Sequence, residues 1–271
     1  MGSKDIYWKR HHRARLTRDL IRADLLGGRW RDTKLPSEAE MAERYAASRN
    51  AVREALELLV DENLLKRIHG YGTVSQASIV EYEVNHLQSL SEQGDTGFIE
   101  HDTVTWAFTP APATIAEVFG VDSGTPVMLW ERITMSPVPV IFWSSYLNPR
   151  FEYSLPQKGL GTYSFFEYNN LEVELADFRT GAIAADPSVA QFLDIESGSP
   201  TLFQTRFLYR RDGTPLEVCS GYFRSDRIVL ATSHRRSHAE RNPGELTEMN
   251  GSSVAEESKK CGDPSSPTTT K

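Results

Sequence analysis

The stretch LPSEAEMAERYAASRNAVREALELLVDENLLKRIHGYGTV, residues 35–74, contains start and stop signals for two helices. Ser37 can cap the first helix, and Glu40, three residues on, completes a capping box. A short break at residues 46–47 leads to Ser48, which can cap the next helix. Apolar residues then recur at helical spacing and predict one buried face: Val52, Ala55, Leu56, Leu59 and Val60.

The flanking residues complete a small domain. Downstream, residues 64–74 alternate in polarity around a turn at His69-Gly70-Tyr71-Gly72, which predicts a β-hairpin with a glycine-rich tip. Upstream, Gly27-Gly28 ends a further predicted helix. Its apolar residues also recur at helical spacing: Leu16, Leu20, Ile21 and Leu25.

Three helices followed by a hairpin predict a winged helix-turn-helix, in which the third helix enters the major groove of DNA. That helix begins with short polar and basic side chains, where they can reach base edges. Arginine can read guanine and asparagine can read adenine, and Arg49 and Arg53 lie one helical turn apart. Two arginines on a helix are also typical of a solvated face, so the combination with the hairpin is the more specific signal. We predict a DNA-binding surface formed by Ser37, Ser48, Arg49, Asn50, Arg53, His69, Gly70 and Tyr71.

These segments resemble the DNA-binding domain of the GntR family of regulators. The resemblance covers nearly all of residues 14–76 and rests on LPSE (35–38), SRNAVREAL (48–56), Leu64-Leu65 and HGYGTV (69–74). It implies that Ser48, Arg49, Asn50, Arg53, His69 and Gly70 meet DNA. Many relatives have an arginine where this chain has Ala39, so the preferred operator is expected to differ.

Charge separates this region from the remainder of the 271-residue chain. Residues 1–76 hold 15 of the 30 Lys and Arg side chains and 11 of the 37 acidic ones, a net charge of +4. The remaining residues therefore have a net charge of −11 within a total of −7. A basic N-terminal region on an acidic body is typical of a nucleic-acid-binding module joined to another domain, although +4 over 76 residues is also within ordinary variation.

The composition indicates a globular protein of the cytoplasm. Only two cysteines are present, Cys219 and Cys261, and they match no metal-binding spacing. No apolar run approaches the ~20 residues that span a bilayer, and the basic N-terminus lacks the apolar core of a signal peptide. The phosphate-binding, hydrolase and metalloprotease motifs are missing. We therefore predict no catalytic residues, no metal site and no cofactor.

The second region has a mixed α and β pattern and gives the chain an α+β class. We expect a winged helix-turn-helix over residues 1–76, a linker with the start of the next domain over 77–101, an effector domain over 102–233 and a disordered tail over 234–271. Strands are predicted at 103–106, 127–130 and 140–143, helices at 115–119 and 185–193, and a hairpin over 202–223. A helix, a glycine turn and a strand occur twice, at 121–130 and 195–203, which suggests a repeated unit, with chance as the alternative.

This second region resembles the UTRA effector-binding domain of the HutC subfamily. Five short segments carry the resemblance: residues 127–132, 145–147, 164–167, 212–217 and 222–227. It implies an antiparallel sheet with helices, similar to chorismate lyase but used for binding. It also implies an effector pocket formed by Arg132, Ser164, Arg179, Glu217, Tyr222 and Phe223. Arginine and serine suit an anion, and a carboxylate suits hydroxyl or amine donors.

Two positions depart from relatives that bind phosphorylated sugars. Thr134 replaces a second arginine, and Trp143 replaces a carboxylate. The loss of one cation removes a charge-assisted contact of about 1.5–3 kcal/mol, so a less anionic or more aromatic ligand is expected. Three of the pocket residues also have a structural alternative: an ion pair for Arg132, an exposed strand position for Glu217, and the core for Phe223.

We expect a homodimer that binds an inverted-repeat operator as a repressor and releases it when a small-molecule effector binds. Two alternatives remain at this stage. The second domain could only dimerise, without a ligand, or the chain could be a lyase-like enzyme with a DNA-binding head.

Overall fold

The computed structural model describes residues 3–30, 33–75, 79–93 and 99–233. Its first part is helical, with α1 (Ser3–Leu26), α2 (Glu38–Arg44) and α3 (Arg49–Asp61). Both predicted caps form. The Ser37 hydroxyl accepts from the Glu40 amide while the Glu40 carboxylate accepts from the Ser37 amide, and the Ser48 hydroxyl accepts from the Ala51 amide. These bonds satisfy amides that the first turn of a helix leaves free, so α2 and α3 begin where the caps predict.

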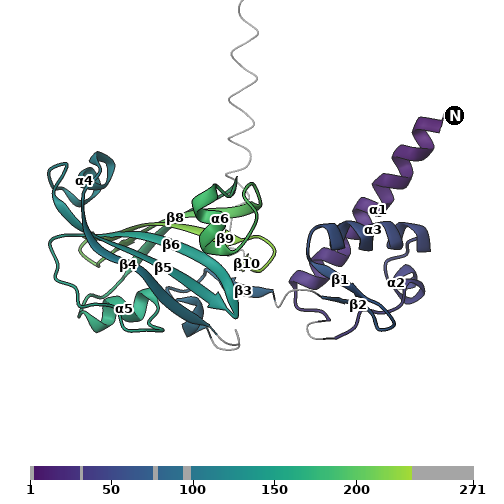
Figure 1. Cartoon of the computed structure of the whole chain (residues 1–271), viewed down its shortest axis with the longest axis horizontal. Helices are drawn as coiled ribbons and strands as arrows, with labels where there is room; N and C mark the ends of the chain where they lie inside the picture. Colours follow the sequence, from purple (N-terminus) through teal and green to yellow (C-terminus); the bar gives the residue numbers. More distant parts are fainter. Residues whose placement is uncertain (1–2, 31–32, 76–78, 94–98, 234–271) are drawn as a thin grey trace, which may run out of the picture. The chain divides into compact units, whose positions relative to one another are not determined.

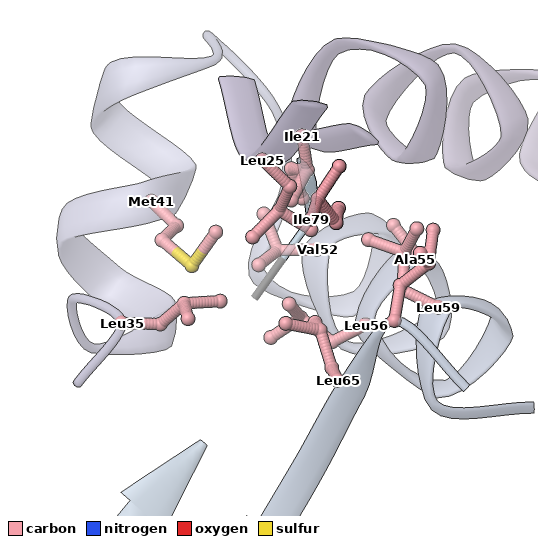
Figure 2. Packing of buried hydrophobic residues seen from close by; sticks show 11 residues of the cluster. Ile21, Leu25, Leu35, Met41, Val52, Ala55, Leu56, Leu59, Leu65 and Ile79 are labelled. Carbon is pink, nitrogen blue, oxygen red and sulfur yellow. The ribbon is translucent and has the colours of Figure 1, made fainter. Parts of the chain in front are cut away.

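The three helices share one apolar core with the first strand of the hairpin (Figure 2). α3 contributes the largest share, and its buried side chains agree with the predicted stripe except that Val60 is half-buried and Ala51 is buried as well. The core comprises Ile21, Leu25, Leu35, Met41, Val52, Ala55, Leu56, Leu59, Leu64, Leu65 and Ile79.

The buried face of α1 differs from the predicted one. Leu16 and Leu20 are 45% and 54% exposed, whereas Ala14, Thr17 and Ile21 are buried. Adjacent positions on a helix lie about 100° apart, and in α1 the core takes Ile21 while Leu20 faces away from it. The stripe at 14, 17, 21 and 25 has the same period as the predicted one, but it is displaced around the helix.

The turn between α2 and α3 and the tip of the hairpin both require unusual backbone angles. Ala46 has a φ of +47°, a conformation that costs a residue with a side chain about 1–2 kcal/mol. The hairpin forms as predicted, from β1 (Leu65–Ile68) and β2 (Gly72–Ser75). Gly70 and Gly72 at its tip have φ of +74° and +130°, which glycine adopts without strain.

The second part is built on one six-stranded antiparallel sheet, as the α+β class predicted (Figure 1). Its order is β4-β5-β6-β9-β8-β7. The strands are β4 (Glu100–Pro110), β5 (Pro126–Ser136), β6 (Val138–Leu147), β7 (Leu175–Ala184), β8 (Pro200–Tyr209) and β9 (Pro215–Arg224).

Helices cover both faces of this sheet (Figure 1). α4 (Ala113–Phe119) and α6 (Pro187–Leu193) pack on the face that presents Val218 and Tyr222 of β9. α5 (Thr162–Tyr168) packs on the opposite face, against Trp130 and Leu208.

Part of the expected linker over 77–101 is ordered on the same face as α5. β3 (Val80–Glu83) pairs in parallel with β10 (Ile228–Ala231), and η1 (Leu90–Glu92) is a single 3-10 turn. The buried Val80 and Tyr82 of β3 join Trp143 and Phe223 of the sheet in one apolar cluster. The polar composition of this segment therefore concealed a buried strand. The predicted disordered tail over 234–271 lies outside the described residues.

The sheet repeats itself with an offset of 74 residues. Gly124 donates to the Ala111 carbonyl at 2.9 Å, and Gly198 donates to the Ala185 carbonyl at 2.8 Å. The Ala111 and Ala185 amides donate in turn to Thr125 and Ser199, each at 2.8 Å. Because β4-β5-β6 is followed in space by β9-β8-β7, the two halves meet at β6 and β9 as if related by a two-fold axis. The repeated unit suggested by the sequence is therefore confirmed.

The packing of α3 yields a stability prediction with a matched control. Leu59→Ala removes a fully buried side chain and should destabilise the N-terminal domain by about 2–5 kcal/mol. Leu20→Ala, at a half-exposed position of α1, should change stability by less than about 0.5 kcal/mol. Urea unfolding followed by far-UV circular dichroism measures both, and equal effects of the two substitutions would contradict the packing described.

Candidate effector site and DNA-binding surface

All the side chains predicted to meet DNA are exposed. Ser48, Arg49, Asn50 and Arg53 lie along the first turn and a half of α3 and its cap, away from the buried stripe. Ser37 caps α2, and its hydroxyl lies 2.7 Å from the Glu40 carboxylate. A basic, solvent-facing start to the third helix is the arrangement that major-groove recognition requires.

Arg53 is held by an acidic neighbour within this surface. Its guanidinium donates to both carboxylate oxygens of Glu38, with Nε–Oε1 at 3.2 Å and Nη2–Oε2 at 2.8 Å. The hydrogen bond from Arg53 lowers the pKa of Glu38, so the carboxylate stays charged. Within the described part of the chain no ion pair involves Arg49. The two arginines therefore differ, because Arg53 has to exchange a partner to contact DNA and Arg49 does not.

The β1–β2 hairpin, which forms the wing, is hydrogen-bonded to the segment before α2. The Leu35 amide donates to the Thr73 carbonyl at 2.9 Å, and Lys34 forms a β-bridge with Val74. The Lys34 ammonium lies 5.8 Å from the centre of the exposed Tyr71 ring. Lys34 thus adds a cation beside the predicted wing residues His69, Gly70 and Tyr71, which are all exposed. Sequence reasoning did not single it out, because it lies outside both the helix and the hairpin tip.

Three charged side chains are buried together at the centre of the second domain. Arg132 comes from β5, Arg206 from β8 and Glu217 from β9, and none is more than 1% exposed. Arg206 Nε and Nη2 each lie 2.9 Å from Glu217 Oε2, whereas Arg132 Nη2 lies 3.7 Å from Oε1. Glu217 is therefore bound closely by Arg206 and more loosely by Arg132.

Hydroxyl groups and aromatic rings surround the two arginines. Thr162, the first residue of α5, accepts from Arg132 Nη2 at 2.6 Å and from Arg206 Nη2 at 3.2 Å. Ser145 accepts a further bond from Arg132. The Trp143 ring lies 4.7 Å from Arg206 Cζ and 5.6 Å from Arg132 Cζ, and cation–π attraction of this kind is stronger when both groups are desolvated.

The buried group holds more positive charge than negative. Desolvation lowers the pKa of Arg132. Desolvation also opposes the charge of Arg206, but Glu217 together with Cys219, Tyr163 and Tyr82 outweighs it, so the pKa of Arg206 is raised. Arg132 is thus the less compensated cation. Among the described residues Glu217 Oε1 and Tyr163 Oη are buried without a hydrogen-bond partner. Buried charges and polar groups normally find partners, so the site has unused capacity to bind an anion with donor and acceptor groups.

A second hydrogen-bonded chain forms one wall of the site. Thr134 Oγ1 lies 3.0 Å from His101 Nδ1 and accepts from the Trp143 indole at 3.2 Å. His101 Nε2 lies 3.0 Å from the hydroxyl of Ser91 in η1. Desolvation, with the charges of Arg132 and Arg206, lowers the pKa of His101 to about 4, so the ring is neutral at pH 7. Thr134 and Trp143 thus join a chain of neutral hydrogen bonds.

The cavity between these groups is small. Its volume is about 10 Å³, close to the minimum that holds one water. The lining comes from the sheet, from α5 and from η1: Tyr82, Ser89, Leu90, His101, Thr134, Ile141, Trp143, Thr162 and Arg206. Ligand pockets for drug-sized molecules measure about 300–1,000 Å³, so a wall has to move before a small molecule can enter.

Comparisons with known proteins agree with this architecture. Residues 14–74 match the model for bacterial regulatory proteins of the gntR family, and residues 99–229 match the UTRA domain. The chain is 30% identical over 219 residues to the HTH-type transcriptional regulator Rv0792c of Mycobacterium tuberculosis, covering 76% of this chain and 80% of the relative. This protein belongs to the GntR family.

Other relatives are similar in extent. The HTH-type transcriptional repressor NagR of Bacillus subtilis is 27% identical over 205 residues, covering 73% of this chain and 84% of the repressor. The crystal structure of PhnF from Mycobacterium smegmatis superimposes with a TM-score of 0.58 at 22% identity, over 74% of this chain and 91% of that one. The GntR family consists of regulators, so the prediction that the chain is not an enzyme is confirmed. No helix within the described residues is long and apolar enough to cross a membrane.

The structure brings only some of the predicted effector residues of this GntR protein together. Arg132 and Glu217 meet, but Arg179 lies exposed on the edge strand β7, with its guanidinium 5.4 Å from the Phe207 ring. Tyr222 packs beneath α6 on the opposite face of the sheet. The two aromatic residues were predicted as a pair, but neighbouring strand residues face opposite sides, so they cannot line one pocket.

The remaining two predicted residues lie at the margin of the site. Phe223 is on the face of Arg206, where its ring meets Trp143 edge-to-face at 5.1 Å. Ser164 lies in the first turn of α5, and both its amide and its hydroxyl donate to Glu92.

Sequence reasoning missed Arg206, although a signal for it was present. Arg206 follows Arg132 by 74 residues, the offset that relates Ala111 to Ala185. Extending the repeat by a few residues from Phe203 would have matched the two arginines. The family resemblance did not indicate Arg206, because none of its segments included β8 at that position.

The charge imbalance gives a stability prediction. Glu217→Gln leaves two buried arginines without a carboxylate and should cost about 3–5 kcal/mol. Arg206→Met leaves the Arg132–Glu217 pair balanced and should cost less. Thermal unfolding of the full chain compares the two variants, and a larger loss in Arg206→Met than in Glu217→Gln would contradict the proposed excess of positive charge.

The neutral His101 gives a pH dependence. The unfolded chain takes up a proton near pH 6.5, whereas the folded protein does so only near pH 4. The stabilisation is therefore complete above about pH 6.5 and is lost progressively as the pH falls toward 4, up to about 3 kcal/mol. Urea unfolding at pH 7.5, 6.0 and 5.0 should show a smaller loss for His101→Gln than for the wild type. His86→Gln, at an exposed position, should follow the wild type.

Proposed function

We propose that this GntR protein is a dimeric cytoplasmic repressor, which a small anionic molecule releases from an inverted-repeat operator. The names of two relatives support repression. NagR is a transcriptional repressor, and a relative from Escherichia coli, 24% identical over 210 residues, is the probable repressor of a fructoselysine utilisation operon. The observation that carries the effector proposal is the burial of Arg132 and Arg206 around a single carboxylate, Glu217.

The proposed DNA contacts divide between α3 and the β1–β2 hairpin of the N-terminal domain. Arg49 and Asn50 suit base edges, with Ser48 at the helix start for a phosphate. His69, Gly70 and Tyr71 at the wing tip, with Lys34 beside them, suit the phosphate backbone or the minor groove.

The proposed effector carries a negative charge and hydrogen-bonding groups. An anion would offset the charge of Arg132, and hydroxyl or amine groups would satisfy Glu217 Oε1. The aromatic walls from Trp143 and Tyr163 would suit the apolar face of a ring. A domain that only dimerises has no need for two buried arginines, which favours ligand binding over that alternative.

The edge of the sheet supports a dimer. β7 pairs with β8 on one side, and within the described residues its other edge has no strand partner. Leu175 and Ile183 of β7 are exposed large apolar side chains. An uncovered ten-residue edge strand is a template for pairing with a second chain. A two-fold dimer would match the symmetry of an inverted repeat.

The DNA surface can be tested by a gel shift on the gene's own upstream region. Arg49→Ala should weaken operator binding by about 1–3 kcal/mol, or roughly 5- to 150-fold, because it removes a free base-reading cation. Glu38→Gln should strengthen it, because Arg53 is released from its ion pair. Arg211→Ala, at an exposed position of the second domain, is the control and should have no effect. Unchanged affinity in both Arg49→Ala and Arg53→Ala would overturn the surface.

A further inference from the structure

Glu92 in η1 contacts the same groups that an anionic effector would need. Its Oε1 accepts from the Ser164 amide at 3.2 Å and from the Ser164 hydroxyl, and its Oε2 accepts from the Ser89 amide at 2.7 Å. Ser164 is one of the residues predicted to bind the effector. A carboxylate of the protein itself therefore occupies donors expected to hold a ligand's anionic group.

The turn that carries Glu92 also forms part of the cavity wall. Ser89 and Leu90 line it together with Thr162 and Arg206. A methyl group at Gly161 would lie 2.4 Å from Ser89 Oγ and 3.0 Å from Glu92 Oε1, so the turn is seated directly against the start of α5. Ser91 adds a contact to His101. Residues 89–92 are thus held by polar contacts to α5 and to His101 of β4.

The other walls are less able to move. Arg132, Arg206 and Glu217 lie on three strands of the six-stranded sheet, and α5 is anchored by the fully buried Phe165 and Phe166. The η1 turn is a single 3-10 turn of three residues, of which only Leu90 is buried in an apolar cluster. Its Ser91 and Glu92 contact the site through side-chain hydrogen bonds. Opening a cavity of about 10 Å³ for a small molecule is therefore easiest by releasing this turn.

We infer that the Glu92 carboxylate occupies the position of the effector's anionic group in the unliganded protein, and that the effector binds by displacing the Ser89–Glu92 turn. This inference rests on the proposed anionic effector. The turn belongs to the segment that joins the wing to the sheet, so its release would change that connection when the site is filled. Effector affinity would then include the cost of removing Glu92 from Ser164, and weakening that contact would strengthen effector binding.

The test is calorimetric titration of the full-length protein with inorganic phosphate, glucose 6-phosphate and glucuronate, with glucose as the neutral control. Glu92→Gln keeps the size of the side chain and removes its charge, and Glu92→Ala removes the contact. At least one of the three anions should bind the wild type, and Glu92→Gln should bind it about tenfold more tightly. Glu81→Gln, on the exposed side of β3, should bind as the wild type does.

Hydrogen exchange separates displacement from simple repulsion between like charges. In the wild type, the bound anion should speed exchange over residues 87–93, whose amides include those of Ser89 and Glu92, and slow it over residues 161–166. Slower or unchanged exchange over 87–93 would overturn the displacement, as would equal affinity of wild type and Glu92→Gln for the anion. Binding of no anion to either protein would overturn the anionic effector itself, and the inference with it. Thermal unfolding of each variant without anion checks that it is folded.

Discussion

The buried contact of Arg132 and Arg206 with Glu217 constrains the whole second domain. Charged groups removed from water have to be paired and hydrogen-bonded, and these three side chains come from three strands. Their meeting requires β5, β8 and β9 to be in register and α5 to place Thr162 between the two guanidinium groups. One carboxylate for two arginines leaves an excess of positive charge at the centre of the sheet, and the proposed effector chemistry follows from that excess.

The two-fold repeat explains how such a site arises at this place. Each half of the sheet contributes one arginine at an equivalent position, and the halves meet at β6 and β9. The symmetry does not extend to the residues paired with the arginines on the two central strands. Arg132 of β5 pairs with Trp143 of β6, whereas Arg206 of β8 pairs with Cys219 of β9. The site is thus symmetric in its cations and asymmetric in its aromatic and acidic groups. Such asymmetry suits a ligand whose two ends differ in chemistry, for example an anionic group at one end and hydroxyl groups at the other.

The N-terminal domain was easier to predict, because its sequence signals are local. Capping residues at Ser37 and Ser48 and the apolar stripe of α3 act over three or four residues, so the sequence was sufficient to predict helices and hairpin. The stripe of α1 was displaced because Leu20 and Ile21 are both apolar, and only packing against α3 selects Ile21. The Arg53–Glu38 pair was not predictable in the same way, since it joins two helices across the turn at Ala46.

The sequence by itself determined the helices and hairpin of the N-terminal domain, several strands of the second domain, the order of the two domains and the family, because caps, periodicity and short motifs act within a few residues. The family resemblance also grouped Arg132 with Glu217, and these two side chains lie together in the structure. Only the tertiary structure decided which other residues join them. Strand alternation sends Tyr222 to the far face, edge position leaves Arg179 exposed, and strand order brings Arg206 beside Glu217. Glu92 meets Ser164 across 72 residues, and no local pattern reports a contact between segments so far apart.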